Sequence, residues 1–336
     1  MSSLNRIYFG PAGTGKTREA ITEAEKVVNS SPVFKGMLLS EEESFKEFSQ
    51  SFDNHDDYEH LSKKAFDHKK NIYPLIDFVT FHPSYSYQDF IEGLRPTKSG
   101  SFEVVDGVFK NIVDRALKNS EYNYVLIIDE INRGDISSIF GEFFTLLEDS
   151  RRADQKEAIE ITLPYSRDKK LKVPSNLYIF GTMNTVDKSI ALLDIALRRR
   201  FDFIEVLPKP QLLDDVNGVS LSELLKILNQ RISILKSENY QIGHSLFLNL
   251  SSFDEVKSVI VKKVIPLLQE YFYDDWQSIC AVLNQSFEND GEILERVETT
   301  SDLFKSEFSE LIEFKNGAYF RVNSSFSAED LKRVYE

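Results

Sequence analysis

The chain has 336 residues, of which 40 are basic and 54 acidic, so its formal net charge is −14. This acidic charge argues against a protein that binds nucleic acid over its whole surface, although it is compatible with a local basic groove. A single cysteine, Cys280, excludes an internal disulfide framework. No apolar run approaches a membrane span and the first residues lack a signal-peptide pattern, so we expect a soluble cytoplasmic protein.

Short apolar runs alternate with helical patterns along the first two hundred residues. Alternation of this kind predicts an α/β fold, with a parallel sheet covered by helices on both faces. A hairpin is predicted at 97–110, where Gly100 lies between polar flanks and apolar residues follow. The expected strands are 6–10, 76–81, 123–130, 176–184 and 203–208, and the expected helices are 16–29, 86–96, 111–120, 135–149 and 188–201.

The pattern changes twice, which suggests three parts. A polar, charge-mixed stretch at about 34–70 reads as a surface insertion in the first part, residues 1–208. After Pro208 and Pro210, helical patterns dominate and predict a small helical lid domain at 209–285. The remaining residues, 286–336, form a C-terminal extension of unknown fold, with a possible strand at 317–322.

The segment GPAGTGKT fits the phosphate-loop pattern G-x-x-x-x-G-K-[ST] between a predicted strand and a predicted helix. Its glycines let backbone N–H groups converge on phosphate oxygens, and the helix points its positive end at the same anion. The lysine reaches the β and γ phosphates and the threonine hydroxyl ligates Mg²⁺. A chance glycine-rich turn is the alternative, and the flanking elements argue against it. The predicted nucleotide-binding residues are Gly10, Pro11, Ala12, Gly13, Thr14, Gly15, Lys16 and Thr17.

Two adjacent acids, Asp129 and Glu130, end the apolar strand at 123–130. Phosphoryl transfer places charge on the γ-phosphate, so a carboxylate must help to hold Mg²⁺ there. We expect Asp129 to hold Mg²⁺ together with Thr17, and Glu130 to orient or deprotonate the attacking water. The alternative is a pair of solvated acids at a strand exit. The adjacent pair favours the AAA+ class of P-loop NTPases over small GTPases, which position water with a glutamine.

An asparagine ends the next predicted strand, and three arginines lie at the end of the predicted helix that follows it. Asn184 follows a buried strand, where its amide would sense the γ-phosphate; a helix N-cap is the alternative. Arg198, Arg199 and Arg200 end a predicted helix, and the helix dipole alone explains one or two of them. The planar fork of arginine suits phosphate oxygens, and an arginine supplied by a neighbouring subunit of a ring would act as an arginine finger.

Four segments together resemble the McrB motor subunit of McrBC-type, modified-cytosine-dependent restriction systems: FHPSYSYQDFIEGLRP, DEINRGDISSIFGEFFTLLED, GTMNTVDKSIALLDIALRRRF and IGHSLF. The resemblance covers about residues 5–276. It implies an AAA+ motor that hydrolyses GTP, with ATP as the other candidate, and uses Mg²⁺. It also implies a hexameric ring that joins a McrC-like nuclease subunit and drives DNA translocation in restriction and anti-phage defence.

The resemblance carries roles onto individual residues. The phosphate loop, the acidic pair and Asn184 match family positions, and Asp187 matches the acid that follows in the signature. The trans-acting arginines correspond to Arg199 and Arg200. His244 lies in the predicted lid, where it is either a second nucleotide sensor or a packed lid residue. Lys188 replaces the arginine of the signature, which keeps the charge but loses bidentate geometry.

Several expectations stay open. No domain that reads modified cytosine fits before residue 5, so DNA specificity is expected in the tail or in another chain. Asn132 and Arg133 are expected to face a subunit boundary. His82, together with Tyr85 and Tyr87, would contact the base, a partner or DNA, unless these residues pack in the core. A MoxR-like ATPase that remodels protein partners is the alternative function, which the charge of −14 slightly favours.

Overall fold

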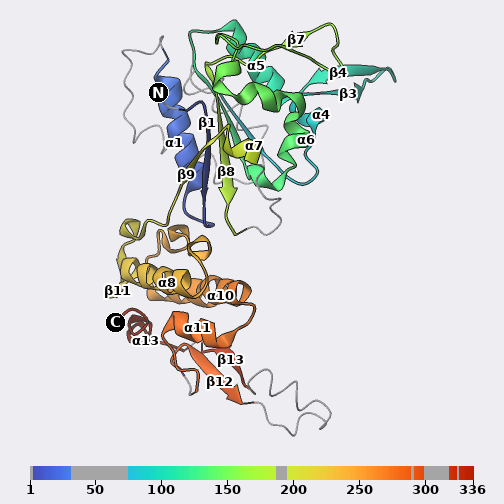
Figure 1. The fold of residues 1–336 in the computed structure, drawn as a ribbon. Helices are drawn as coiled ribbons and strands as arrows, with labels where there is room; N and C mark the ends of the chain where they lie inside the picture. The colour runs from blue at the N-terminus through green and yellow to red at the C-terminus, as the bar shows by residue number, and fades with distance from the viewer. Residues whose placement is uncertain (1–2, 32–74, 187–194, 289–290, 299–317, 324) are drawn as a thin grey trace. The chain divides into compact units, whose positions relative to one another are not determined.

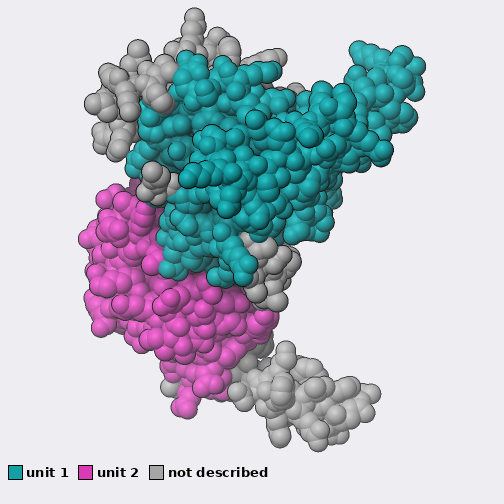
Figure 2. Space-filling view, turned by 45° about the horizontal axis from the view of Figure 1, so that its top comes forward, with its two compact units in different colours: residues 1–9, 16–205 teal, residues 10–15, 206–336 magenta. Residues whose placement is uncertain are grey.

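The computed structural model describes residues 3–31, 75–186, 195–288, 291–298, 318–323 and 325–336 (Figure 1). The chain divides into two compact units (Figure 2). The first contains Met1–Phe9 and Lys16–Glu205, and the second contains Gly10–Gly15 and Val206–Glu336. The expected insertion at 34–70 lies outside the described residues, as do Asp187 and Lys188.

A five-stranded sheet forms the centre of the first unit, in the order β2-β5-β8-β1-β9. Its strands pair in parallel where β2 meets β5, β5 meets β8 and β1 meets β9, which confirms the predicted α/β fold. The strands are β1 (Asn5–Gly10), β2 (Ile76–Thr80), β5 (Tyr124–Asp129), β8 (Leu177–Asn184) and β9 (Asp202–Glu205). Helices that flank them are α1 (Lys16–Asn29), α5 (Val108–Lys118), α6 (Ile136–Phe140) and α7 (Ile195–Arg198).

Apolar burial follows the periodicity of each element. Strand β5 is buried from Tyr124 to Ile128, as expected of a central parallel strand covered on both faces. A cluster of stacked and edge-on phenylalanine rings lies beside the sheet and accounts for part of the high phenylalanine content. Its members are Phe81, Phe90, Phe109, Phe140 and Phe143. The core is therefore dense around the edge of the sheet that holds β2 and β5.

The predicted helix at 86–96 is wrong over most of its length. Helix α4 (Tyr87–Phe90) has four residues, and β3 (Glu92–Pro96) follows it directly. Strand β3 pairs with β4 (Phe102–Asp106) in antiparallel fashion. Gly93 suits this arrangement, because a Cβ there would lie less than 3.0 Å from the Gln88 side chain. Long-range backbone pairing and this close approach outweigh the helical pattern.

Two other boundaries differ from the predictions. The predicted hairpin exists, but residues 97–101 form only its turn, and Val108 already begins α5. The predicted helix at 135–149 ends early, because Gly141 adopts a φ of 51° after α6. A 3-10 helix, Gly141–Leu147, continues from there. A short ribbon of β6 (Ile161–Thr162) and β7 (Lys170–Leu171) was not predicted.

The second unit is mainly helical, as predicted for the lid. Its helices are α8 (Leu221–Leu235), α9 (Phe253–Val259), α10 (Ile265–Phe272) and α11 (Trp276–Leu283), with a π-helical turn, Ile260–Val264, between α9 and α10. Strands β10 (Asp215–Val216) and β11 (Val219–Ser220) form a small ribbon before α8. Along the described parts of the chain, every helix is too short or too polar to cross a lipid bilayer.

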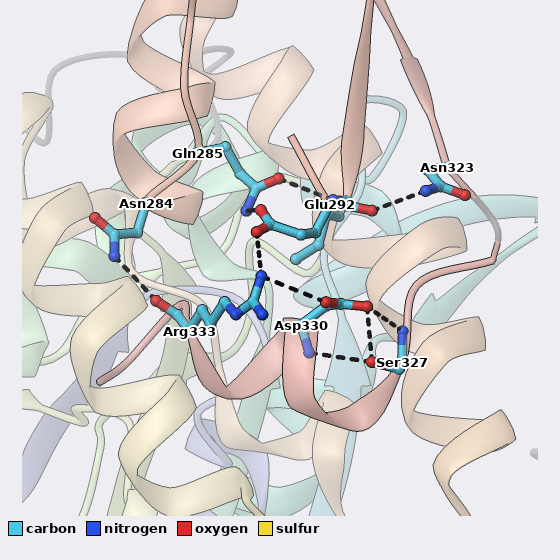
Figure 3. A network of polar contacts seen from close by, with 8 residues as sticks. Asn284, Gln285, Glu292, Asn323, Ser327, Asp330 and Arg333 are labelled. Carbon is cyan, nitrogen blue, oxygen red and sulfur yellow. Dashed lines mark hydrogen bonds and ion pairs between the residues drawn. The ribbon is translucent and has the colours of Figure 1, made fainter. Parts of the chain in front are cut away.

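The tail packs within the second unit. Strand β12 (Leu294–Glu298) pairs with β13 (Ala318–Val322), which confirms the possible strand, and α13 (Ala328–Lys332) follows. Figure 3 shows the polar contacts that hold these pieces. The Arg333 side chain forms ion pairs with Glu292 and Asp330, and the Arg333 carbonyl accepts a hydrogen bond from Asn284 after α11 at 2.9 Å. The end of the chain is therefore joined to the helices that precede it.

Candidate nucleotide-hydrolysis site

Three elements of the first unit converge on one carboxylate oxygen. Thr17, at the start of α1, donates a hydrogen bond from Oγ1 to Oδ1 of Asp129 at 2.9 Å. Thr182, on β8, donates from its Oγ1 to the same oxygen at 2.6 Å. Asp129 ends β5, so the structure brings together the two residues that the sequence predicts as the Mg²⁺ ligands. The side chain of Lys16, which precedes this threonine, is buried.

These donors suit a magnesium ion. Hydroxyl and carboxylate oxygens are hard ligands, and Mg²⁺ is usually held by one or two carboxylates together with water and substrate phosphates. Across the described residues, no cluster of three or more His, Cys, Asp or Glu side chains forms an all-protein cage. Thr17 and Asp129 offer one hydroxyl and one carboxylate, a set that fits Mg²⁺ when phosphates complete its shell.

Each oxygen of the Glu130 carboxylate contacts another side chain. Asn184 donates from Nδ2 to Oε1 at 2.8 Å, and Nε of Arg133 lies 3.2 Å from Oε2. The backbone N–H of Glu130 donates to Oγ1 of Thr182 at 3.2 Å. Glu130 also has a φ of 52°, a left-handed conformation that is strained for a residue with a side chain. Strain of this kind clusters at functional sites, so the backbone supports the role predicted for this acid.

Two residues of this network were not predicted as site residues. Thr182 lies two positions before Asn184, so strand alternation places both on the same face of β8, and this signal was available. Arg133 was expected at a subunit boundary, but its side chain pairs with Glu130 three residues earlier. Its neighbour Asn132 is buried, and no described residue forms a hydrogen bond with its side-chain amide.

The glycines of the phosphate loop pack closely on the lid within the second unit. The N–H of Ser245 donates to the carbonyl of Gly13 at 3.1 Å. Gly13 has a φ of 75°, and a Cβ there would collide with the hydroxyl of Ser245. A Cβ on Gly243 would lie well under 3.0 Å from the backbone of Ala12 and Gly13. Residues without side chains are thus required on both sides of this contact.

His244 lies in the middle of that contact. Its ring is buried, and Cε1 is 4.0 Å from the position that a Cβ on Gly15 would take. Its Nδ1 accepts a hydrogen bond from the backbone N–H of Lys209 at 3.2 Å, so the neutral ring carries its proton on Nε2. Asn229 of α8 fixes Ile242, two residues before His244, by hydrogen bonds to its carbonyl (2.9 Å) and from its N–H (2.6 Å). His244 is both packed in the lid and adjacent to the phosphate loop.

The three consecutive arginines have different surroundings. Arg200 forms an ion pair with Glu148 at 2.6 Å, and its guanidinium lies 4.6 Å from the centre of the Phe144 ring. Arg198 lies over the ring of Phe203. Arg199 is exposed, and no described residue of the chain forms an ion pair with its guanidinium. Arg199 is therefore the arginine of this run that is available to a neighbouring molecule.

The aromatic residues that follow β2 also have different surroundings. Tyr85 stacks on the buried Phe81 ring with centroids 4.9 Å apart, and the exposed His82 lies edge-on to Tyr85. Tyr87 instead lines a surface pocket and donates its hydroxyl hydrogen bond to Glu142 at 2.8 Å. Core packing therefore accounts for the contact that Tyr85 makes with Phe81, whereas Tyr87 is open to an external ligand.

Comparison with known proteins agrees with this geometry. Residues 76–201 match the family model of the AAA domain of the dynein-related subfamily. Residues 220–280 match the model described as McrB, alpha-helical lid domain. The two matches cover strands β2, β5 and β8, with Asp129 and Glu130, and the lid that carries His244. They confirm the predicted order of the AAA module and lid, and an AAA domain implies nucleotide binding.

Two curated proteins are each similar to more than half of this chain. One is the type IV methyl-directed restriction enzyme EcoKMcrB subunit of Escherichia coli (strain K12), 38% identical over 220 residues, which cover 60% of this chain and 48% of that protein. The other is the type II restriction enzyme BsuMI component YdiS of Bacillus subtilis (strain 168), 29% identical over 208 residues, 59% of this chain and 56% of that protein. The chain thus spans about half the length of these relatives. Along this chain, a region similar to the AAA domain of the dynein-related subfamily is followed by a region similar to the McrB lid domain.

Proposed function

We propose that this chain is the nucleotide-driven motor of a McrBC-like restriction system active in anti-phage defence. It would hydrolyse GTP in a hexameric ring, join a McrC-like nuclease subunit and drive DNA translocation. The observation that carries the proposal is the arrangement around Glu130, where a strand-end acid, Asn184 and the pair of Thr17 and Asp129 lie on one sheet edge. The names of the two relatives, both restriction enzyme components, supply the biological setting.

The residues of the first unit divide the chemistry among them. Thr17 and Asp129 would hold Mg²⁺, which neutralises charge on the transferring phosphoryl group when bound. Glu130 is the group that accepts a proton from the attacking water. Asn184 fixes one oxygen of Glu130, and its amide would orient that water. Arg133 fixes the other oxygen, but its side chain is 46% exposed, so the ion pair orients Glu130 more than it stabilises the fold.

We assign the trans-acting role to Arg199 rather than to Arg200. Arg200 is already engaged by Glu148 and Phe144 of its own subunit. In a ring, an exposed arginine at the end of α7 can reach the phosphates bound by the next subunit. An arginine finger contributes about 10³-fold or more to kcat. Arg199→Ala should lose turnover on that scale, and mixing with Lys16→Ala subunits should restore part of it, because each variant supplies what the other lacks.

Arg200→Ala provides the matched control for the arginine assignment. It should lower the melting temperature and should not be rescued by mixing. If Arg200→Ala is rescued and Arg199→Ala turns over normally, the assignment is reversed. Absence of rescue in both variants would contradict action in trans.

The choice of nucleotide and partner needs a direct test. Hydrolysis of GTP and of ATP should be measured with and without the nuclease subunit, at saturating Mg²⁺. We expect faster GTP turnover, stimulation by the nuclease subunit and DNA cleavage only when both proteins and GTP are present. Equal or faster ATP turnover would overturn the GTP assignment. ATP-dependent remodelling of a protein partner without DNA cleavage would instead support the MoxR-like alternative, which the net charge of −14 favours.

A further inference from the structure

The ribbon of β3 and β4 carries an apolar face that is open to solvent. It extends away from the rest of the first unit (Figure 1). The pairing sets Leu94 opposite Val104 and Pro96 opposite Phe102, and strand alternation places all four side chains on one face. Leu94 is 45% exposed, Val104 38% and Phe102 69%. A contiguous exposed apolar patch of this kind is typical of an interaction surface.

The ribbon does not need its apolar face to keep its shape. The buried Nζ of Lys110 contacts Glu92 at 2.9 Å and Asp106 at 2.5 Å, where the two strands begin and end. Glu92 also accepts hydrogen bonds from the N–H groups of Tyr165 and Ser166, each at 3.0 Å. Burial opposes ionisation, but the hydrogen bonds from Lys110 and Ser166 hold the pKa of Glu92 below its ordinary value. An isolated two-stranded hairpin is marginally stable, so this anchor is what fixes the ribbon.

A pocket of about 460 Å³ lies at the root of the ribbon. Its position follows from two contacts, the close approach of Gly93 to Gln88 and the hydrogen bond from Tyr165 to Glu92. Its lining combines aromatic, apolar and acidic groups. The lining residues are Ser86, Tyr87, Gln88, Glu142, Pro164 and Tyr165.

The pocket has the chemistry to accept a cation. Glu142 is exposed, one of its carboxylate oxygens accepts the hydroxyl hydrogen bond of Tyr87, and no Lys or Arg among the described residues forms an ion pair with it. The Tyr87 and Tyr165 rings lie beside it, and aromatic faces attract guanidinium and ammonium groups. A carboxylate also forms strong charge-assisted hydrogen bonds with arginine.

We propose that this surface binds an extended segment of a partner protein that carries alternating apolar side chains and an arginine or lysine. The apolar side chains would lie on Leu94, Phe102 and Val104, while the basic side chain enters the pocket beside Glu142. Charge complementarity selects this occupant, because the chain carries a net charge of −14 and the pocket presents a carboxylate. The phosphates of a nucleic acid backbone would meet repulsion from the Glu142 carboxylate. The binding surface does not depend on the nucleotide that the motor hydrolyses.

The test uses the full chain and a phage-displayed library of random ten-residue peptides. Enriched peptides, synthesised with a fluorophore, are titrated by fluorescence polarisation. They should combine alternating apolar residues with Arg or Lys. Glu142→Gln should weaken their binding about tenfold, and Val104→Thr about fivefold. Glu103→Gln and Val105→Thr are matched controls, because these residues lie on the opposite face of β4, and they should change the affinity less than about twofold.

Other results would overturn the proposal. They include a library without enrichment, enriched peptides without basic residues, and equal weakening by the control variants. Two further experiments address other occupants: sedimentation of the wild type and Val104→Thr, and competition by single-stranded oligonucleotides. Loss of self-association in Val104→Thr would assign the face to a second copy, and displacement of the peptides by DNA would assign it to nucleic acid. Basal nucleotide hydrolysis should be normal in all these variants, which separates this proposal from that of the motor.

Discussion

Side-chain hydrogen bonds position the residues at the edge of the sheet, whereas close backbone packing forms the contact between phosphate loop and lid. At the sheet edge, three side chains on one strand and one helix position two carboxylates through hydrogen bonds of 2.6–2.9 Å. At the loop, glycines permit backbone to lie directly on backbone, as between Gly13 and Gly243. Substitutions at the edge should therefore act on the chemical step. Substitutions at the loop should act on nucleotide affinity.

The largest expected effect separates chemistry from binding at the sheet edge. Glu130→Gln keeps the shape of the side chain but removes the base, and general base catalysis contributes about 10²–10⁴-fold to a rate. We expect kcat to fall by that factor, measured by phosphate release, while the nucleotide Kd stays within about twofold of wild type. Glu157→Gln, which removes an exposed acid elsewhere, is the control. Normal turnover in Glu130→Gln would refute the role given to this residue.

A substitution at the contact between phosphate loop and lid should instead change nucleotide affinity more than kcat. Gly243→Ala forces a Cβ into the backbone of Gly13 and displaces the loop, and the loss of one charge-assisted hydrogen bond to phosphate, about 1.5–3 kcal/mol, weakens binding by about 10–10²-fold. The loss should appear mainly in the Kd for nucleotide, measured with a fluorescent analogue. Ser245→Ala is the control, since it keeps the N–H that binds Gly13. If Gly243→Ala binds nucleotide normally and only kcat falls, then the loop contact affects the chemical step, as the sheet edge does, and the contrast between the two regions is refuted.

The hydrogen bonds of Asn229, which hold the lid segment next to the phosphate loop, should contribute to the stability of the fold. Asn229→Ala leaves the buried N–H and carbonyl of Ile242 without their partner, at a cost of about 2 kcal/mol. Calorimetry should show a melting temperature lower by roughly 4 °C. Ser233→Ala, one turn further along α8, removes a single part-buried hydroxyl and should have a smaller effect. Equal shifts in both variants would show that the Asn229 contacts do not stabilise the lid specifically.

The smallest effect is expected at Thr182. Thr182→Val preserves the shape but removes the hydroxyl between Asp129 and the backbone of Glu130. Loss of a hydrogen bond of about 1 kcal/mol corresponds to a fall in kcat of about fivefold. Thr182→Ser retains the hydroxyl and should recover most of the rate. An unchanged rate in Thr182→Val would mean that the other contacts of the acids are sufficient.

The sequence predicted what lies at strand ends and missed what depends on distant pairing. Asp129, Glu130 and Asn184 were found because apolar strands end at them, and parallel strands present their carboxyl ends at one edge. Strand β3 was missed, because its stability comes from pairing with β4 and from a buried lysine that local patterns do not reveal. The difference between Arg199 and Arg200 was equally hidden, since it rests on Glu148, some fifty positions earlier in the chain.

The left-handed backbone of Glu130 also has an evolutionary consequence. A glycine or asparagine at this position would adopt the same φ more easily and should raise the stability of the fold by about 1 kcal/mol. Either replacement would remove the acid. Selection for robustness and selection for turnover therefore act in opposite directions at this single position. A degenerate descendant that has lost catalysis would be expected to drift toward glycine or asparagine there.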